Sequence, residues 1–380
     1  MFFIFFIYLA SVYLLMSCED AESDNIIDSA VQLKLITSGE LVVSTDSLFT
    51  VETASNFFIS GSEELPVLTV RLSDLIYDFD LVSGTQVSRK EVPLEGPSSI
   101  GDFNQLDGIA KLEDSTYLYF SHFLKEVYKI SKDTVFSTMN REEAQPHEIN
   151  FMSASYAPIE SVNEYLLIST IPSTVSNLSK LPAITLYNTE TNQISHPLHY
   201  SEKYGQHFWG YHPYQYLTSV RYIESLNKFY VSYPIEDFVY VYDKDFNFEQ
   251  KKSVSSKYIR KIDYLHDEPI QEGQVYDYNK DRDYFTNLSY YPLAFYDSNS
   301  SRYYRIARKV LIEESGERLL NYTVIVCDSN LNVLDEVELD EQYSIVYSFM
   351  SPKGLMLYNT SKNVKDSELH YDLVNFVEVD

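Results

Sequence analysis

Phe238-Val-Tyr-Val-Tyr-Asp243 is a short run of β-branched and aromatic residues that ends on an aspartate, and five similar runs occur along the chain. Two of them are Ala183-Ile-Thr-Leu-Tyr-Asn188 and Thr323-Val-Ile-Val-Cys-Asp328, and the other three end at positions 80, 131 and 374. The ends of neighbouring runs are 46 to 57 residues apart, except for one interval of 85 between positions 243 and 328. Such a recurring distance indicates an array of similar structural units with one insertion.

Each run has the surroundings of a β-hairpin. Asp243-Lys-Asp-Phe-Asn247 follows the first run, and Asx residues of this kind favour tight turns. Partner strands are expected upstream, as in Lys228-Phe-Tyr-Val-Ser-Tyr233 and Tyr117-Leu-Tyr-Phe-Ser121. Four strands in roughly 50 residues, repeated six times without a convincing amphipathic helix, predict an all-β, six-bladed β-propeller. A pair of β-sandwiches is the competing architecture.

The two ends of the chain predict how the ring closes. The last unit reaches Asp380 one strand short, so we expect the segment Val31-Gln-Leu-Lys-Leu-Ile36 to supply the missing strand. The long interval contains the polar stretch 266–283, which we interpret as an insertion between blades. Part of it, residues 277–283, resembles half of a calcium loop, but Arg282 stands where glycine is needed. We therefore expect a solvated acidic loop there and no metal site.

The N-terminus has the pattern of an exported lipoprotein. Phe2 to Met16 is apolar and uncharged, and Ser17-Cys18 after it resembles the bacterial lipobox. The run is too short for a membrane-spanning helix, which needs about 20 residues. We expect residues 1–17 to be a signal peptide, Cys18 to carry the lipid, and residues 18–25 to form an acidic flexible tether. Residues 26–380 then form one propeller domain.

The acidic tether also bears on location. Glu19-Asp-Ala-Glu-Ser-Asp24 resembles an export tag by which Bacteroidota direct lipoproteins to the outer face of the outer membrane. We expect an outer-membrane lipoprotein displayed on the cell surface; the alternative is a spacer facing the periplasm.

Composition limits the partners. The chain has 29 Lys plus Arg against 56 Asp plus Glu, which gives a formal charge of −27. Because this charge repels phosphate backbones, we do not expect the protein to bind nucleic acid. Cys327 is the second of only two cysteines, so no intrachain disulfide can form once Cys18 is acylated. Alternation in Val324-Ile-Val-Cys-Asp328 predicts that Cys327 is a buried, inert strand thiol. No cofactor is expected.

Two segments resemble a known family. They are Leu94-Glu-Gly-Pro-Ser-Ser-Ile-Gly-Asp-Phe103 and Ala294-Phe-Tyr-Asp-Ser-Asn-Ser-Ser-Arg-Tyr-Tyr-Arg-Ile306. Both look like recurring motifs of an uncharacterised family of Bacteroidota lipoproteins with a TolB-like six-bladed propeller, described as a domain of unknown function. The resemblance would cover residues 25 to 380. It implies the fold and the location, and it brings no established activity.

The candidate site rests on aromatic and imidazole side chains. Four of the eight histidines lie between His196 and His212, together with the only Trp. The ligand-binding candidates are His207, Trp209, Tyr211, His212, Tyr214 and Arg305. Rings and imidazoles supply stacking faces and hydrogen bonds for a glycan or peptide. The alternatives are a purely structural cluster that closes a gap between blades, or a transition-metal site.

Arg305 has two interpretations of its own. It could project into the central channel to hold an anionic group, or it could tie two blades together through backbone carbonyls or a carboxylate.

No catalytic motif is present: the sequence lacks a nucleophile elbow, a His-Glu-x-x-His helix and a phosphate-binding loop. We therefore expect a lipid-anchored propeller at the cell envelope that binds a ligand or a partner protein without catalysis. The alternative is a hydrolase or lyase acting on polysaccharide, because propellers can assemble such sites from scattered side chains. A pocket with convergent acid and base groups would favour the enzyme.

Overall fold

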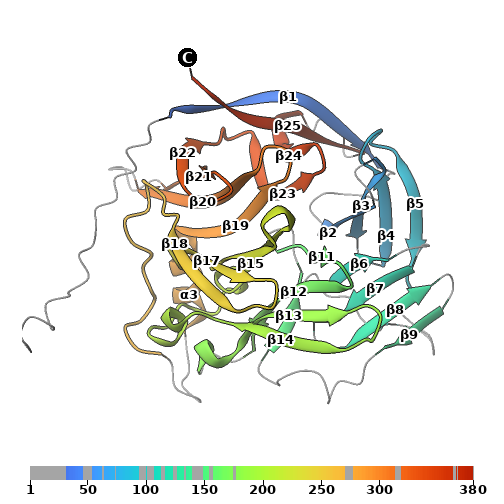
Figure 1. Ribbon diagram of the computed structural model, residues 1–380, viewed down its shortest axis with the longest axis horizontal. Coiled ribbons are helices and arrows are strands. Elements are labelled where there is room, and N and C mark those ends of the chain that lie inside the picture. Colours follow the sequence, from blue (N-terminus) through green and yellow to red (C-terminus); the bar gives the residue numbers. More distant parts are fainter. Residues whose placement is uncertain are drawn as a thin grey trace, which may run out of the picture.

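Six antiparallel sheets surround one axis, as Figure 1 shows. The computed structural model describes residues 31–379 except 46–53, 62–63, 73, 94–99, 101–106, 113–115, 123–125, 132–133, 139–148, 154–156, 174–176, 270–276, 313–317, 363–364 and 366. Blade 1 contains β2 (Ala54–Gly61), β3 (Pro66–Leu72), β4 (Leu75–Asp80) and β5 (Gln86–Glu91). Blade 2 contains β6 (Gly108–Lys111), β7 (Thr116–Phe120), β8 (Val127–Ser131) and β9 (Thr134–Ser137). Blade 3 contains β10 (Ile149–Met152), β11 (Glu160–Val162), β12 (Tyr165–Pro172), β13 (Pro182–Asn188) and β14 (Ile194–His199).

The second half of the ring repeats the pattern. Blade 4 contains β15 (Ser219–Ile223), β16 (Lys228–Ser232), β17 (Phe238–Asp243) and β18 (Phe248–Ser253). Blade 5 contains β19 (Tyr290–Asp297), β20 (Arg302–Ile312), β21 (Arg318–Cys327) and β22 (Val333–Glu338). Blade 6 contains β23 (Tyr343–Ser351), β24 (Gly354–Asn359), β25 (Glu368–Glu378) and β1 (Leu33–Ser44). The recurring runs of the sequence are the third strands of the six blades, so the predicted six-bladed propeller is confirmed.

Closure of the ring by the N-terminus is also confirmed. Strand β1 pairs antiparallel with β25 as the outermost strand of blade 6, from Leu33 opposite Glu378 to Ser44 opposite Glu368. The strand is longer and lies further along the chain than the predicted Val31–Ile36. This pairing joins the two ends of the chain through backbone hydrogen bonds, and it covers the edge of β25, which would otherwise be an open sheet edge.

The direction of the strands defines two faces. In blades 1 to 5 the chain runs from the innermost strand outwards through antiparallel neighbours, so the innermost strands all run the same way. Their C-terminal ends share one face of the ring, which we call the pocket face, and their N-terminal ends share the opposite face. Because β23 and β25 run in the same direction, Glu378 and its partner Leu33 lie at the pocket face. The chain therefore enters the domain at that face.

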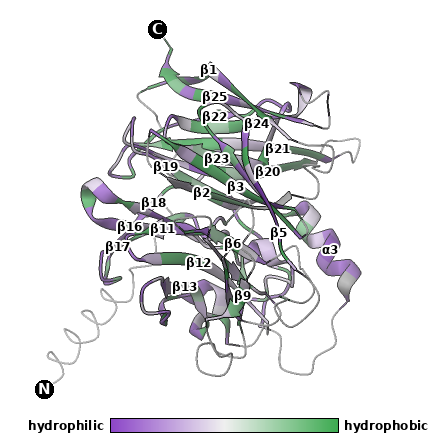
Figure 2. Ribbon diagram, turned by 90° about the vertical axis from the view of Figure 1, so that its right-hand side faces the viewer, coloured by the Kyte–Doolittle hydropathy of each residue, from purple (hydrophilic) through white to green (hydrophobic). Residues whose placement is uncertain are grey.

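The insertion before blade 5 contains a helix, and the prediction of a solvated acidic loop was wrong there. Helix α3 (Tyr278–Asn287) begins after Asp277, whose side chain accepts a hydrogen bond from the Asn279 amide. Arg308 donates to the carbonyls of Phe285, Thr286 and Leu288 at the helix end. These contacts provide hydrogen-bond partners for backbone groups at the ends of the helix, which would otherwise have none within the helix. In the edge view of Figure 2, α3 is a mainly hydrophilic element at one side of the ring.

Short 3-10 helices complete the connections. They are η2 (Leu178–Lys180), η3 (Glu202–Gly205), η4 (Pro213–Gln215), η5 (Glu224–Leu226) and η6 (Thr360–Lys362).

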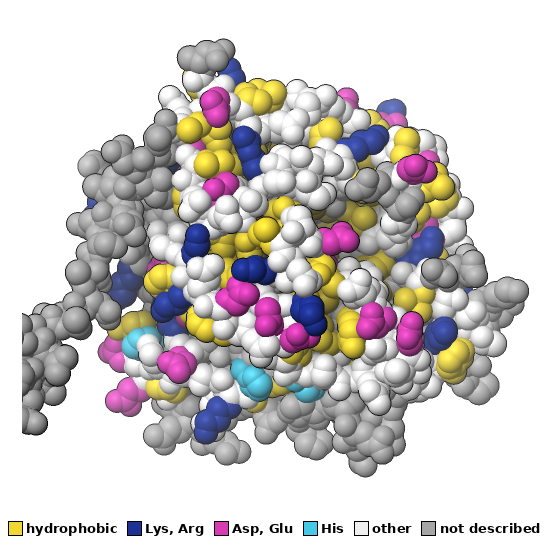
Figure 3. Space-filling view, in the orientation of Figure 1, with side chains coloured by type: hydrophobic (Ala, Val, Ile, Leu, Met, Phe, Trp, Pro, Cys, Tyr) yellow, Lys and Arg dark blue, Asp and Glu magenta, His cyan; other side chains and the backbone are white. Residues whose placement is uncertain are grey.

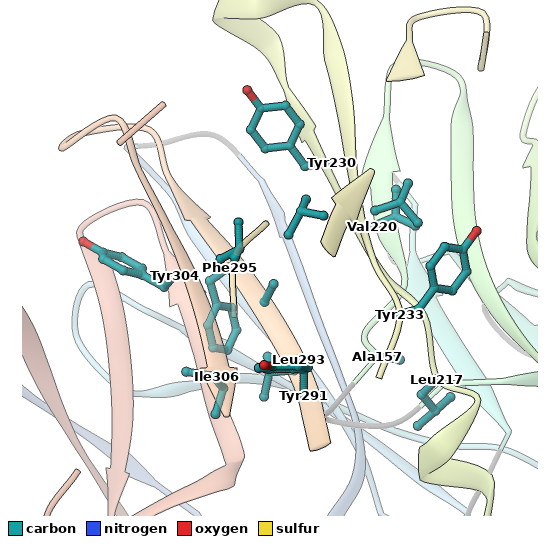
Figure 4. Close-up of a cluster of buried hydrophobic side chains, with 14 of the residues drawn as sticks. Ala157, Leu217, Val220, Tyr230, Tyr233, Tyr291, Leu293, Phe295, Tyr304 and Ile306 are labelled. Atoms are coloured by element: carbon teal, nitrogen blue, oxygen red, sulfur yellow. The ribbon is translucent and has the colours of Figure 1, made fainter. Parts of the chain in front are cut away.

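Tyrosines and aliphatic side chains fill the space between blades. Figure 4 shows part of the largest hydrophobic cluster of the described residues, which contains Val220 and Tyr230 from blade 4 and Phe295 and Ile306 from blade 5. Cys327 belongs to the same cluster and has no exposed surface, so its predicted burial is confirmed. Burial also raises the pKa of its thiol, which keeps it protonated.

Buried carboxylates add polar ties between blades. Asp78 on β4 accepts hydrogen bonds from Thr69 and Ser88 of its own blade and from Lys111 and Tyr117 of blade 2. Burial alone would raise the pKa of Asp78, but these hydrogen bonds hold it below its ordinary value. Asp78 is therefore a charged cross-link between neighbouring sheets.

Candidate functional site

A pocket of about 670 Å³ opens at the pocket face. It is lined by β2, the β11 region, β15 with η5, β19 with the turn after it, and β23, which are the innermost elements of five blades. The pocket therefore occupies the mouth of the central channel. In Figure 3 hydrophobic side chains gather around the middle of the ring, with acidic and basic side chains among them. Its volume lies in the range of small-molecule sites, about 300 to 1,000 Å³.

One ion pair lies in this pocket. Glu160 begins β11, and its Oε2 accepts a hydrogen bond of 2.9 Å from Arg221 Nη1 on β15 of the next blade. Its Oε1 accepts from the Tyr222 backbone amide at 3.3 Å. The Glu160 side chain is 25% exposed and that of Arg221 is 10% exposed. Burial raises the pKa of Glu160, although the charge and the hydrogen bond of Arg221 oppose this shift.

Backbone carbonyl groups hold the guanidinium of Arg221 in place. Its Nε donates to the Ala294 carbonyl at 2.8 Å, and its Nη1 also donates to the Val220 carbonyl at 2.7 Å. The guanidinium carbon lies 5.8 Å from the ring centroid of Phe295. Among the described residues Nη2 has no hydrogen-bond partner.

The remaining lining is mostly apolar with hydroxyl groups at the rim. Rings come from Phe57, Phe295, Phe349, Tyr222 and Tyr296. Exposed serines and Glu224 lie at the hairpins. An apolar wall with a few fixed polar groups is the usual composition of a ligand site, because the wall supplies affinity and the polar groups supply orientation.

The histidine and tryptophan cluster predicted from the sequence lies on the opposite face. Residues 200–218 connect the end of β14 to the start of β15, whereas the pocket is lined by the second half of β15 and by Glu224 and Ser225 after it. Trp209 is fully buried, and its Nε1 donates to the Lys203 carbonyl at 3.2 Å. Its ring packs edge-on against Tyr264 and His207. This burial supports the structural alternative for Trp209, in which the ring closes a gap beside blade 4.

Of the neighbouring candidates, His207 contacts Trp209 directly. His207 stacks on Tyr264 at 3.9 Å between centroids and contacts the Asp267 carbonyl through Nδ1 at 2.8 Å. Tyr211 is 44% exposed, and its backbone amide donates to Asp281.

His212 and Tyr214 pack against helix α3. The imidazole of His212 stacks on Phe285 at 3.4 Å, with Tyr214 5.0 Å away. Burial and the nearby Arg308 charge lower the pKa of His212 to about 4, so it is neutral at physiological pH. These side chains join the inserted helix to blade 4.

Arg305 is completely buried and binds blade 4. Its Nε donates to the Ser232 hydroxyl, and its two terminal nitrogens donate to the carbonyls of Val254, Tyr233 and Glu236. The guanidinium also stacks on the Tyr291 ring at 3.7 Å. These contacts correspond to the second interpretation of Arg305, a tie between blades through backbone carbonyls.

Sequence reasoning missed Glu160 and Arg221. The available signal was Ser219-Val-Arg-Tyr-Ile223, a short β-prone stretch that the charged Arg221 interrupts. Of the motifs that suggested the family, Leu94–Phe103 lies outside the described residues apart from Ile100, and Ala294–Ile306 forms the β19–β20 hairpin. Cys18 and the acidic tether also lie outside the described residues.

Two negative findings apply to the described part of the chain. No helix there is long and apolar enough to cross a membrane. No group of three or more His, Cys, Asp or Glu side chains there could hold a metal ion.

Comparison with known proteins supports this architecture. A family model described as domain of unknown function DUF4221 matches residues 32–338. A crystal structure of a Bacteroides vulgatus protein of that family is similar at 14% identity, covering 92% of this chain and 99% of that one, with a TM-score of 0.69. A Bacteroides fragilis protein described as exported is 10% identical over 93% of this chain and 97% of its own, with a TM-score of 0.50.

A TolB-type protein from Agrobacterium tumefaciens is 10% identical over 92% of this chain and 100% of its own, but its TM-score of 0.41 is too low to carry an argument. No curated protein matches the chain.

Proposed function

Since this chain belongs to the DUF4221 family, whose function is unknown, we propose that it is a ligand-binding propeller of the cell envelope whose ligand occupies the central pocket at the pocket face. The observation that carries this proposal is the pair of Glu160 and Arg221 at the wall of an apolar pocket of about 670 Å³. A carboxyl group with a raised pKa in a pocket is a frequent mark of a functional site.

The proposed lipid anchor is compatible with this pocket. Cys18 precedes Leu33, where β1 begins at the pocket face, by 15 residues. A chain of that length spans at most about 50 Å. An acylated Cys18 would therefore tether the domain to the outer membrane through a link that joins it at the edge of the pocket face, within about 50 Å of the membrane. The acidic residues after Cys18 favour display on the cell surface rather than a location facing the periplasm.

Occlusion of the pocket tests the proposal. Ser161 is exposed and lines the pocket, so Ser161→Trp should fill it without disturbing buried contacts. A library of small amphipathic fragments is screened by thermal shift against the wild type, Ser161→Trp and the control Ser195→Trp. Ser195 is also exposed but lies on β14, the outermost strand of the same blade. Fragments that raise the melting temperature of the wild type and of Ser195→Trp but not of Ser161→Trp support the proposal. Fragments that stabilise Ser161→Trp as much as the wild type contradict it.

A polysaccharide hydrolase or lyase is the second candidate. It is favoured by one observation: Glu160 and Glu224 both line the pocket, so an acid and a base could converge on one substrate. Glu160→Gln should then abolish cleavage of a polysaccharide that the wild-type protein degrades. Unchanged product release by Glu160→Gln would exclude Glu160 as the catalytic acid.

A further inference from the structure

The charges and rings of the central pocket indicate which ligands it can hold. Building on the proposal that this pocket is the ligand site, we infer that its ligand is a small organic cation, an ammonium or guanidinium group with an apolar body.

The charge of the pocket is the first reason. Its lining contains two carboxyl groups, Glu160 and Glu224, and a single guanidinium, Arg221. The positive charge of Arg221 is already matched by Glu160 at 2.9 Å. The whole chain carries a formal charge of −27, which repels anions and concentrates cations at the surface. An anionic ligand would therefore meet an unfavourable field, and a cation a favourable one.

Glu160 provides the second reason. Burial raises the pKa of this carboxyl even with Arg221 beside it, so one guanidinium does not fully compensate the desolvated carboxylate. The titratable groups that line the pocket around it are Arg221, Tyr222, Glu224 and Tyr296. Of these only Arg221 carries a positive charge at neutral pH. A bound cation would supply the missing charge and would favour the ionised form of Glu160.

The aromatic lining is the third reason. Phe57, Phe295, Phe349, Tyr222 and Tyr296 reach the pocket from four blades. Aromatic faces attract cations, most strongly where water is excluded. One cation already uses this lining, because the Arg221 guanidinium lies 5.8 Å from the centroid of Phe295. Aromatic rings together with an excess of carboxyl groups over cationic groups in the lining favour a cation over a neutral molecule of the same shape.

A pair of isosteres separates charge from shape. Acetylcholine and 3,3-dimethylbutyl acetate differ only in a quaternary nitrogen against a carbon atom, so isothermal titration of both compares a cation with its neutral equivalent. We expect the cation to bind at least about tenfold more tightly to the wild-type protein, which is the scale of a desolvated cation–π contact with carboxylates nearby. Its affinity should rise with pH as Glu160 loses its proton, whereas binding of the neutral isostere should not follow that titration.

Substitutions locate the preference. Glu160→Gln keeps a similar shape but removes the charge, and it should reduce the preference for the cation to about twofold or less. Glu249→Gln is the control, because Glu249 lies on β18 at the outside of blade 4 and pairs with Lys228. It should leave the preference unchanged.

The outcomes distinguish this inference from the proposed function. Equal binding of the two isosteres, abolished by Ser161→Trp, would overturn the cation inference and leave the pocket as a ligand site. A preference that survives Glu160→Gln together with Glu224→Gln would also overturn it, because pocket carboxylates would then not select the charge. Failure of both isosteres while fragments bind the pocket would likewise overturn it. Loss of all pocket binding would contradict the proposed function itself.

Discussion

Trp209→Ala separates the two interpretations of the cluster on the opposite face. Trp209 is fully buried, packs against Tyr204, His207 and Tyr264, and donates one hydrogen bond to the Lys203 carbonyl. Removal of a buried large aromatic side chain costs about 3 to 5 kcal/mol. With an unfolding entropy of about 2.1 cal/mol/K per residue, a domain of roughly 350 residues loses about 4 to 7 °C in melting temperature.

The assay is thermal unfolding followed by circular dichroism, because the variant lacks the only Trp. Tyr211→Ala is the matched control: Tyr211 is close in sequence but 44% exposed, so we expect a shift of at most about 1 °C. In the wild type, the Trp209 emission should be blue-shifted and resistant to quenchers. An unchanged melting temperature for Trp209→Ala, combined with lost binding of a ligand, would refute the structural interpretation and restore Trp209 as a binding residue.

Three further predictions concern the closure, the cross-link and the anchor. Deletion of residues 19–24 should leave the melting temperature unchanged, whereas deletion of 19–40 should lower it sharply because β25 loses most of β1; equal melting temperatures would argue against closure. Because its folded pKa is lowered, the Asp78 carboxylate stabilises the protein above its unfolded pKa of about 3.8, and this contribution disappears as the pH falls through the folded pKa. Asp78→Asn should therefore cost more unfolding free energy at pH 7 than at pH 3 in denaturant titrations, and an equal cost would refute the ionic cross-link. Cys18→Ser should abolish acyl labelling and the recovery of the protein in the membrane fraction, and a variant that is still acylated would contradict the lipoprotein assignment.

The fold was predictable because its signals are local and repeated. A strand such as Phe238–Asp243 shows its β-branched and aromatic pattern and its Asx turn within ten residues, and the repeat places that strand at the same position in every blade. The inserted helix was missed because Tyr278–Asn287 has little apolar periodicity of its own. Its stability comes from tertiary contacts, such as those of Arg308 with its last carbonyls and of His212 with Phe285.

The candidate site depends on contacts that no local pattern reveals. Glu160 and Arg221 are 61 positions apart and meet because β11 and β15 are innermost elements of neighbouring blades. The histidine cluster was conspicuous by composition alone, and composition does not distinguish a buried ring from a ring that lines a pocket. Knowledge of strand direction would have separated the two, because residues 200–218 precede β15 whereas Glu224 and Ser225, which line the pocket, follow it.

The location of ligand binding is the central claim, and methyl NMR tests it most directly. Met350 lines the central pocket, while Trp209 lies on the opposite face of the ring. Protein labelled at methionine methyl groups and at the Trp indole is titrated with acetylcholine and with the fragments that Ser161→Trp rejects, and Met350→Leu assigns the pocket signal. We predict that the Met350 methyl resonance shifts with saturation while the Trp209 indole resonance stays in place. A saturable shift of the Trp209 resonance with an unmoved Met350 methyl would contradict the account, because binding would then occur at the opposite face.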